Sequence, residues 1–201
     1  MSKQKNGLSP LRMILWGSVL LIGLFATLIY IVRPPEKPLA VFGGEFSLNS
    51  TEGGVFTQDD LVDTKSLIFF GYTFCPEICP TTLSESTSWR EELEIKPEDL
   101  RIIFVSVDPK RDTLEMLGNY IAGFGTPIIG LTGTEEQITD IKRAFGVFSQ
   151  TVGDTSGDEY LVDHTANVFI VDDSGSVIDT IAFGEARPSA IAKIRKLMDM
   201  N

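Results

Sequence analysis

Residues 66–83 read SLIFFGYTFCPEICPTTL. Residues 66–72 form a short, continuous apolar run, which is typical of a strand buried on both faces of a parallel sheet. A helix is predicted over 81–93, directly after the two cysteines. In α/β folds, functional sites lie where such a strand gives way to its helix. The stretch therefore predicts an α/β fold with a site at the cysteines.

The same alternation of strand and helix signals extends outward from this stretch. The predicted elements are an opening hairpin over 46–57, a second buried strand over 101–107, helices over 113–124 and 134–145, a hairpin over 165–183 and a closing helix over 188–198. Capping boxes are predicted at two helix starts, Asp112 with Glu115 and Thr134 with Gln137. Parallel strands joined by helical crossovers predict a three-layer α/β sandwich.

The N-terminal segment predicts a membrane anchor. Residues 13–32 contain no charge, and this length suffices for a helix to cross the hydrocarbon core. The apolar run is too long for a cleaved signal peptide and ends without small residues, so an uncleaved transmembrane helix is favoured. The basic residues before it predict a cytoplasmic N-terminus.

The predicted organisation has four parts. They are a cytoplasmic N-terminus (1–12), a transmembrane anchor (13–32), a proline-rich linker (33–44) and an external domain (45–201). We interpret the chain as a single-pass protein of the bacterial inner membrane with its C-terminal domain in the periplasm.

The charge is unevenly distributed along the chain. Four of the 17 basic residues and none of the 28 acidic residues lie within residues 1–33. The remainder is therefore strongly acidic and repels phosphate backbones. This argues against nucleic acid as a partner.

Cys75 and Cys79 are the only cysteines in the chain. A disulfide closing so short a loop would stabilise the fold by about 2 kcal/mol, against about 5 kcal/mol for a long loop. The following helix N-terminus favours a thiolate, and two thiolates one helical turn apart can converge on one ion. Soft thiolates select Cu(I), although zinc also accepts them. Three residues separate the pair, whereas the ordinary thioredoxin redox motif has two.

His164 is the only histidine, and it follows an acidic loop at 153–159. A lone histidine is more commonly a surface or hydrogen-bonded residue. Here, however, a strand entering the sheet at this point would bring the imidazole towards the cysteine loop. Two thiolates and one imidazole form a three-coordinate site acceptable to Cu(I) and, with a water or carboxylate added, to Cu(II). Asp163 is interpreted as a solvated charge.

Four motifs occur in a distinctive order in the external domain. They are GYTFCPEICPT (71–81), SVDPKRDT (106–113), GLTGT (130–134) and DHT (163–165). Together they resemble the Sco (SenC) copper chaperones of cytochrome c oxidase assembly. The resemblance implies a thioredoxin-like fold and a copper ion, Cu(I) and/or Cu(II), bound by Cys75, Cys79 and His164. Asp108 and Arg111 match the second motif but also suit a loop and a helix start, so neither is assigned as a ligand.

The resemblance also implies partners and leaves alternatives open. It implies copper delivery to the CuA centre of oxidase subunit II, with a periplasmic copper donor or a thioredoxin-like reductant as further partners. The leading hypothesis is thus a metallochaperone and not a turnover enzyme. The alternative is a thiol-disulfide oxidoreductase, with Cys75 and Cys79 as its redox-active pair, that keeps the subunit II cysteines reduced. A peroxidase-like enzyme and a structural zinc site rank lower.

Overall fold

The computed structural model describes residues 10–32, 44–154, 157 and 159–200. The chain divides into two compact units, Met1–Ala40 and Val41–Asn201. The first contains helix α1 (Pro10–Val32). Among the described residues, no helix combines the length and apolar character needed to cross a membrane. The predicted anchor is therefore not confirmed, and most of the predicted N-terminus and linker lies outside the described residues.

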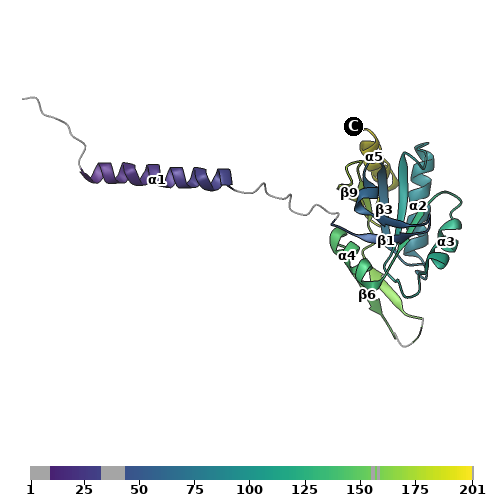
Figure 1. Cartoon of the computed structure of the whole chain (residues 1–201). Helices are drawn as coiled ribbons and strands as arrows, with labels where there is room; N and C mark the ends of the chain where they lie inside the picture. Colours follow the sequence, from purple (N-terminus) through teal and green to yellow (C-terminus); the bar gives the residue numbers. More distant parts are fainter. Residues whose placement is uncertain (1–9, 33–43, 155–156, 158, 201) are drawn as a thin grey trace, which may run out of the picture. The chain divides into compact units, whose positions relative to one another are not determined.

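A central sheet dominates the second unit (Figure 1). Its strand order is β2-β1-β5-β4-β3-β8-β9. The strands are β1 (Ser47–Ser50), β2 (Val55–Thr57), β3 (Lys65–Gly71), β4 (Leu100–Ser106), β5 (Ile129–Thr132), β8 (Val168–Val171) and β9 (Val177–Ile181). β3 and β5 both pair with β4 in parallel, while β8 pairs with β3 in antiparallel. The predicted buried strand after residue 65 is thus confirmed at the centre of the sheet.

Helices connect and follow these strands. In the second unit they are α2 (Ile78–Glu92), α3 (Leu114–Ala122), α4 (Glu135–Phe145) and α5 (Arg187–Met198), with a short 3-10 turn η1 (Gln58–Leu61) after β2. The predicted capping box of Thr134 and Gln137 is present at the start of α4. A proline occupies the first turn of α5, as the sequence predicts.

The capping box predicted for Asp112 and Glu115 is wrong. Thr113, and not Asp112, is the N-cap of α3, and its hydroxyl accepts a hydrogen bond from the Met116 amide. The Asp112 carboxylate points elsewhere, because it accepts hydrogen bonds from Thr73 and Ser106. Asp112 therefore bonds to Thr73, 39 residues away, and does not cap α3.

Helices cover both faces of the sheet. Phe69 and Phe70 are consecutive on β3, so their side chains point to opposite faces. The Phe70 ring lies 5.4 Å from that of Phe145 in α4. On the other face, Phe69 stacks on Phe104, whose ring lies 5.6 Å from that of Tyr120 in α3. The three-layer α/β sandwich is confirmed.

A separate hairpin was not predicted. Strands β6 (Ser149–Val152) and β7 (Leu161–His164) pair in antiparallel as a two-stranded sheet of their own, which leaves the main body of the domain beside α4 (Figure 1). His164 therefore ends β7, and it does not begin a strand of the central sheet as we expected. The central strand starts later, at Val168. β6 is mostly exposed and polar, so it carries no apolar alternation that sequence analysis could detect.

Candidate metal centre

The two cysteines lie where β3 gives way to α2. Cys75 is in the connecting loop, and Cys79 is the second residue of the helix. The helix begins at Ile78, three residues earlier than predicted, because Pro80 is tolerated in a first turn, where no amide donor is required. The Cys79 amide lies 3.4 Å from the Cys75 Sγ and donates to it. The helix N-terminus thus faces the Cys75 sulfur.

The structure brings the three predicted residues together. The Cys79 Sγ lies 3.4 Å from the His164 Nε2, and the three potential ligand atoms, including the Cys75 Sγ, all lie within 4.8 Å of one another. Nitrogen and sulfur bonds to a metal ion of roughly 2.0 to 2.3 Å place two ligand atoms at most about 4.6 Å apart. The three side chains can therefore reach one ion with only small movements.

The His164 ring is held in the orientation that a metal ligand needs. Its Nδ1 lies 3.0 Å from the Thr165 carbonyl oxygen. Because a carbonyl only accepts, Nδ1 carries the proton, and Nε2 turns its lone pair towards the sulfurs. The rings of Phe69 and Tyr72 pack edge-on, each with its centroid 5.9 Å from that of the imidazole. Asp163 is exposed, as expected of a solvated charge.

Gly71, the last residue of β3, makes room for the Cys79 sulfur. A Cβ at this position would lie 2.6 Å from the Cys79 Sγ and 2.8 Å from Cε2 of Phe104. Neither neighbour is free to move, since Cys79 and Phe104 are both fully buried. The missing side chain thus lets the helix bring its sulfur directly over the end of the strand.

The two sulfurs differ in their protonation. A hydrogen bond from the Cys79 thiol, together with backbone amides, lowers the pKa of the Cys75 thiol to about 5. The pKa of Cys79 is raised, because its proton is held in the hydrogen bond to Cys75 and because its sulfur is buried. The metal-free pair therefore holds one proton on Cys79 and a negative charge on Cys75, the softer and more nucleophilic form.

This asymmetry predicts the pH dependence of thiol reactivity. In the reduced full chain, alkylation of Cys75 by iodoacetamide is expected to rise with pH through a midpoint near 5, since only the thiolate reacts. Cys79 is expected to stay unmodified over the same range. The rates are measured by mass spectrometry of the two cysteines between pH 4 and 9. In a Cys79→Ala variant, which lacks the thiol donor, the midpoint should move upward; a wild-type midpoint near the ordinary value of about 8.5 would contradict the assignment.

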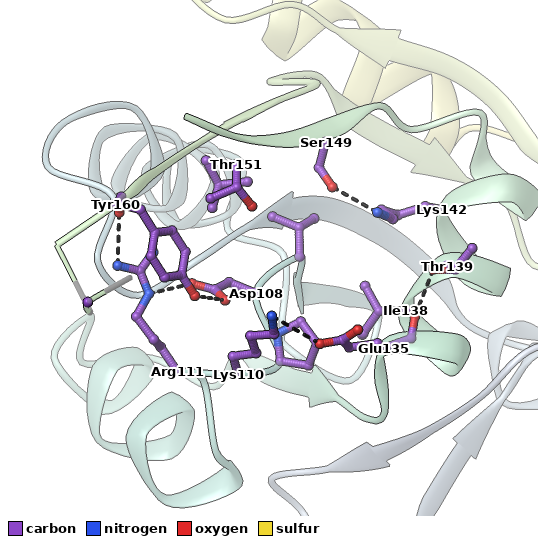
Figure 2. Close-up of a pocket in the computed structure, with 14 residues that line it drawn as sticks. Asp108, Lys110, Arg111, Glu135, Ile138, Thr139, Lys142, Ser149, Thr151 and Tyr160 are labelled. Carbon is purple, nitrogen blue, oxygen red and sulfur yellow. Dashed lines mark hydrogen bonds and ion pairs between the residues drawn. The ribbon is translucent and has the colours of Figure 1, made fainter. Parts of the chain in front are cut away.

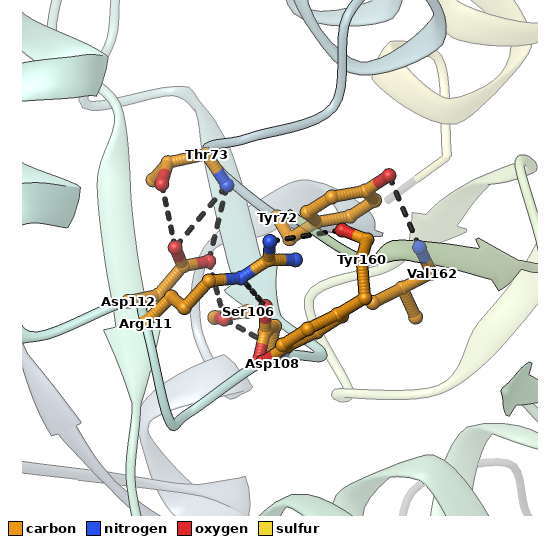
Figure 3. Close-up of polar contacts among 8 residues, drawn as sticks. All are labelled: Tyr72, Thr73, Ser106, Asp108, Arg111, Asp112, Tyr160 and Val162. Carbon is orange, nitrogen blue, oxygen red and sulfur yellow. Dashed lines mark hydrogen bonds and ion pairs between the residues drawn. The ribbon is translucent and has the colours of Figure 1, made fainter. Parts of the chain in front are cut away.

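Polar contacts join the segments that precede the two cysteines and His164 to the rest of the domain (Figure 3). The Tyr72 hydroxyl accepts a hydrogen bond from the Val162 amide at 3.2 Å, which joins β7 to the cysteine loop. The Asp112 carboxylate accepts from the Thr73 hydroxyl at 2.6 Å and from the Thr73 amide. Both aspartates of the SVDPKRDT motif are buried, and that motif was the signal available for Asp112. Tyr72 lies in the GYTFCPEICPT motif, whereas no pattern in the sequence indicated its partner, Val162.

A cavity of about 400 Å³ lies near the hairpin, between the SVDPKRDT loop, α4 and β6 (Figure 2). Its charged side chains are partly engaged with one another, with Lys110 lying 3.4 Å from Glu135 and Lys142 donating to Ser149. Neither cysteine nor His164 lines it. It is thus a feature separate from the candidate metal centre, and it does not supply the pocket that a peroxidase would need at its cysteine.

The fold and this site define a class of protein: a thioredoxin-like α/β domain in which a strand-to-helix loop and a distant histidine bring two cysteine sulfurs and one imidazole together. The SCO1/SenC family model matches residues 34–199. The chain belongs to the SCO1/SenC family.

Individual relatives agree with this assignment. A SCO2-like protein of Rickettsia conorii is 40% identical over 171 residues, which cover 79% of this chain and 83% of the relative. The structure of Arabidopsis thaliana ScoI with copper bound is similar, with a TM-score of 0.71 and 30% identity over 78% of this chain and 98% of that one. Bradyrhizobium japonicum ScoI with copper bound gives a TM-score of 0.70 and 32% identity over 77% and 98% of the two chains.

Proposed function

We propose that this chain is a copper metallochaperone of cytochrome c oxidase assembly, which binds copper through Cys75, Cys79 and His164 and delivers it to the CuA centre of oxidase subunit II. The observation that carries the proposal is the convergence of two sulfurs and one imidazole nitrogen within 4.8 Å of one another. It is supported by the copper bound in the related ScoI structures of two organisms.

The chemistry of the donor set suits a transferable copper ion. Thiolates and imidazole bind Cu(I) well, and three ligands leave a position open to an incoming thiolate. Cys75 is 9% exposed and His164 is half-buried, while Cys79 is fully buried. An acceptor can thus approach from the side of Cys75 and His164 while Cys79 retains the ion until exchange is complete.

Copper transfer tests this proposal. The full chain in detergent, loaded with Cu(I), is mixed with the reduced, metal-free CuA domain of subunit II, and the copper content of each protein is measured after separation. We expect the loaded chain to carry one copper ion and to pass it to the CuA domain. Retention of the copper by the loaded chain, or a stoichiometry well below one, would refute delivery.

A thiol-disulfide exchange activity is the second candidate, and the lowered pKa of Cys75 favours it. In this reaction the Cys75 thiolate attacks one sulfur of the subunit II disulfide, which forms a mixed disulfide and releases the other sulfur as a thiolate. Cys79 then loses its proton and attacks the Cys75 sulfur, which forms the Cys75–Cys79 disulfide and releases the second subunit II thiolate. The chain is left oxidised, and subunit II is left with two thiols. His164→Ala separates the two activities: it is expected to impair copper transfer while reduction of the disulfide-containing CuA domain continues. Equal loss of both activities would show that they cannot be separated through His164.

We also propose that residues 13–32 anchor the chain in the bacterial inner membrane, with residues 1–12 in the cytoplasm, residues 33–44 as linker and the domain at 45–201 in the periplasm. The support is the uncharged stretch itself, which coincides with most of α1. Extraction of membranes with alkaline carbonate should leave the chain in the pellet, and its release into the supernatant would refute the anchor.

A further inference from the structure

His164 lies at the end of a hairpin that forms a sheet of its own. β6 and β7 pair with each other outside the central sheet, and a two-stranded hairpin by itself is only marginally stable in water. Its placement against the cysteine loop therefore depends on side-chain contacts. Tyr160, just before β7, and Val162, within it, are both buried and make such contacts (Figure 3).

Tyr160 forms a buried cluster with Asp108 and Arg111. The Tyr160 hydroxyl donates to Oδ1 of Asp108 at 2.8 Å, and the Arg111 Nε donates to Oδ2 of the same carboxylate. Nη1 of Arg111 donates to the Tyr160 carbonyl oxygen at 2.9 Å. The side chains of Arg111 and Asp108 are only 6% and 5% exposed. Moving Tyr160 away would leave buried polar groups without their partners, so the cluster resists displacement of the hairpin.

The Arg111 guanidinium also links the two segments that carry the proposed ligands. Its central carbon lies 3.6 Å from the centroid of the Tyr160 ring and 4.8 Å from that of Phe74. Phe74 directly precedes Cys75, and Tyr160 lies four residues before His164. Because a guanidinium is attracted to aromatic faces, this cation holds the cysteine loop and the histidine hairpin together.

We propose that the Asp108–Arg111–Tyr160 cluster is a positioning device for the third ligand. It holds β7 so that the His164 imidazole is already beside both sulfurs before copper arrives. The inference rests on the proposed copper site, but none of the three residues is one of the proposed ligands; they act through His164. The same contacts explain why Asp108 and Arg111 are buried beside the site without being ligands.

A double-mutant cycle tests this role. The Cu(I) affinity of the full chain is measured by competition with a chelator for the wild type, Tyr160→Leu, His164→Ala and the double variant. Tyr160→Leu is expected to weaken binding by about tenfold, as changes behind a metal-ligating histidine do. In the His164→Ala background the same change should have almost no effect, since no imidazole remains to be positioned. Equal losses in both backgrounds, or no loss in either, would overturn the proposal.

Tyr160→Phe is a milder substitution, and this variant is expected to remain folded. It retains the ring on Arg111 and removes only the hydroxyl that donates to Asp108. A smaller loss of affinity that again requires His164 is expected, and a loss independent of His164 counts against the device. If Tyr160→Leu does not fold, the cycle with this variant decides the question.

A measurement on the metal-free chain gives a readout independent of copper. The Val162 amide, which donates to Tyr72, is expected to exchange its hydrogen faster in Tyr160→Leu, while the amides of β3 remain protected. Unchanged exchange at Val162 would overturn the proposal.

Failure of the copper site itself would look different, because His164→Ala would then bind Cu(I) as the wild type does. If positioning alone fails, His164→Ala stays weak and Tyr160→Leu binds as tightly as the wild type.

Discussion

Replacing Cys79 by serine is expected to weaken Cu(I) binding by more than about 100-fold, beyond the range seen when a residue behind a metal ligand is changed. The sulfur is fully buried and lies 3.4 Å from the His164 Nε2. A serine hydroxyl is smaller and harder, and it cannot replace a thiolate as a ligand for Cu(I). The loss is measured on the reduced full chain by competition with a Cu(I) chelator.

A control variant and a metal competition accompany this measurement of Cu(I) affinity. Ser84→Ala changes an exposed position on the same helix, away from the sulfurs, and should bind copper as the wild type does. Competition between Zn(II) and Cu(I) for the wild-type chain separates the copper site from a structural zinc site, since thiolate ligands accept both ions. If the Cys79→Ser variant still binds Cu(I) as tightly as the wild type does, Cys79 is not a copper ligand and the proposed site is wrong.

The parts of the fold that local patterns specify could be predicted from the sequence. The apolar run before the cysteines corresponds to β3 in the structure, and the capping box of Thr134 and Gln137 is found at the start of α4. These features depend on neighbours within a few residues, which the sequence displays directly. The position of the cysteines between a strand and its helix follows from the same local signals.

The path of His164 to the site could not be predicted from periodicity. The imidazole arrives on β7, whose partner β6 is largely exposed and carries no apolar alternation. Tyr160, just before β7, has its hydrogen-bond partners Asp108 and Arg111 about fifty residues away in the chain. For the same reason, Asp112 was interpreted as a helix cap although its carboxylate faces Thr73, 39 residues away. Such pairings are set by the assembled fold and leave no local pattern.

Asp112→Ala is expected to lower the free energy of unfolding by about 3 kcal/mol, because it leaves the buried Ser106 hydroxyl and two donors of the half-buried Thr73 without an acceptor. The carboxylate is fully buried and accepts from the hydroxyls of Thr73 and Ser106, both at 2.6 Å, and from the Thr73 amide at 3.1 Å. Thr73 lies two residues before Cys75, so the change should also loosen the cysteine loop. Urea unfolding of the full chain at neutral pH measures the effect.

Asp112→Asn is the matched control, since it keeps the shape and an acceptor oxygen but does not titrate. Burial raises the pKa of Asp112, so the native carboxyl holds its proton to a higher pH than the unfolded one does. The stability that this group contributes is therefore complete below its unfolded pKa of about 3.9 and is lost as the pH rises through the native pKa. The asparagine variant should accordingly gain stability relative to the wild type between pH 4 and 7. A difference that is constant over this range, or that moves the other way, would show that the buried carboxyl is not disfavoured in its charged form.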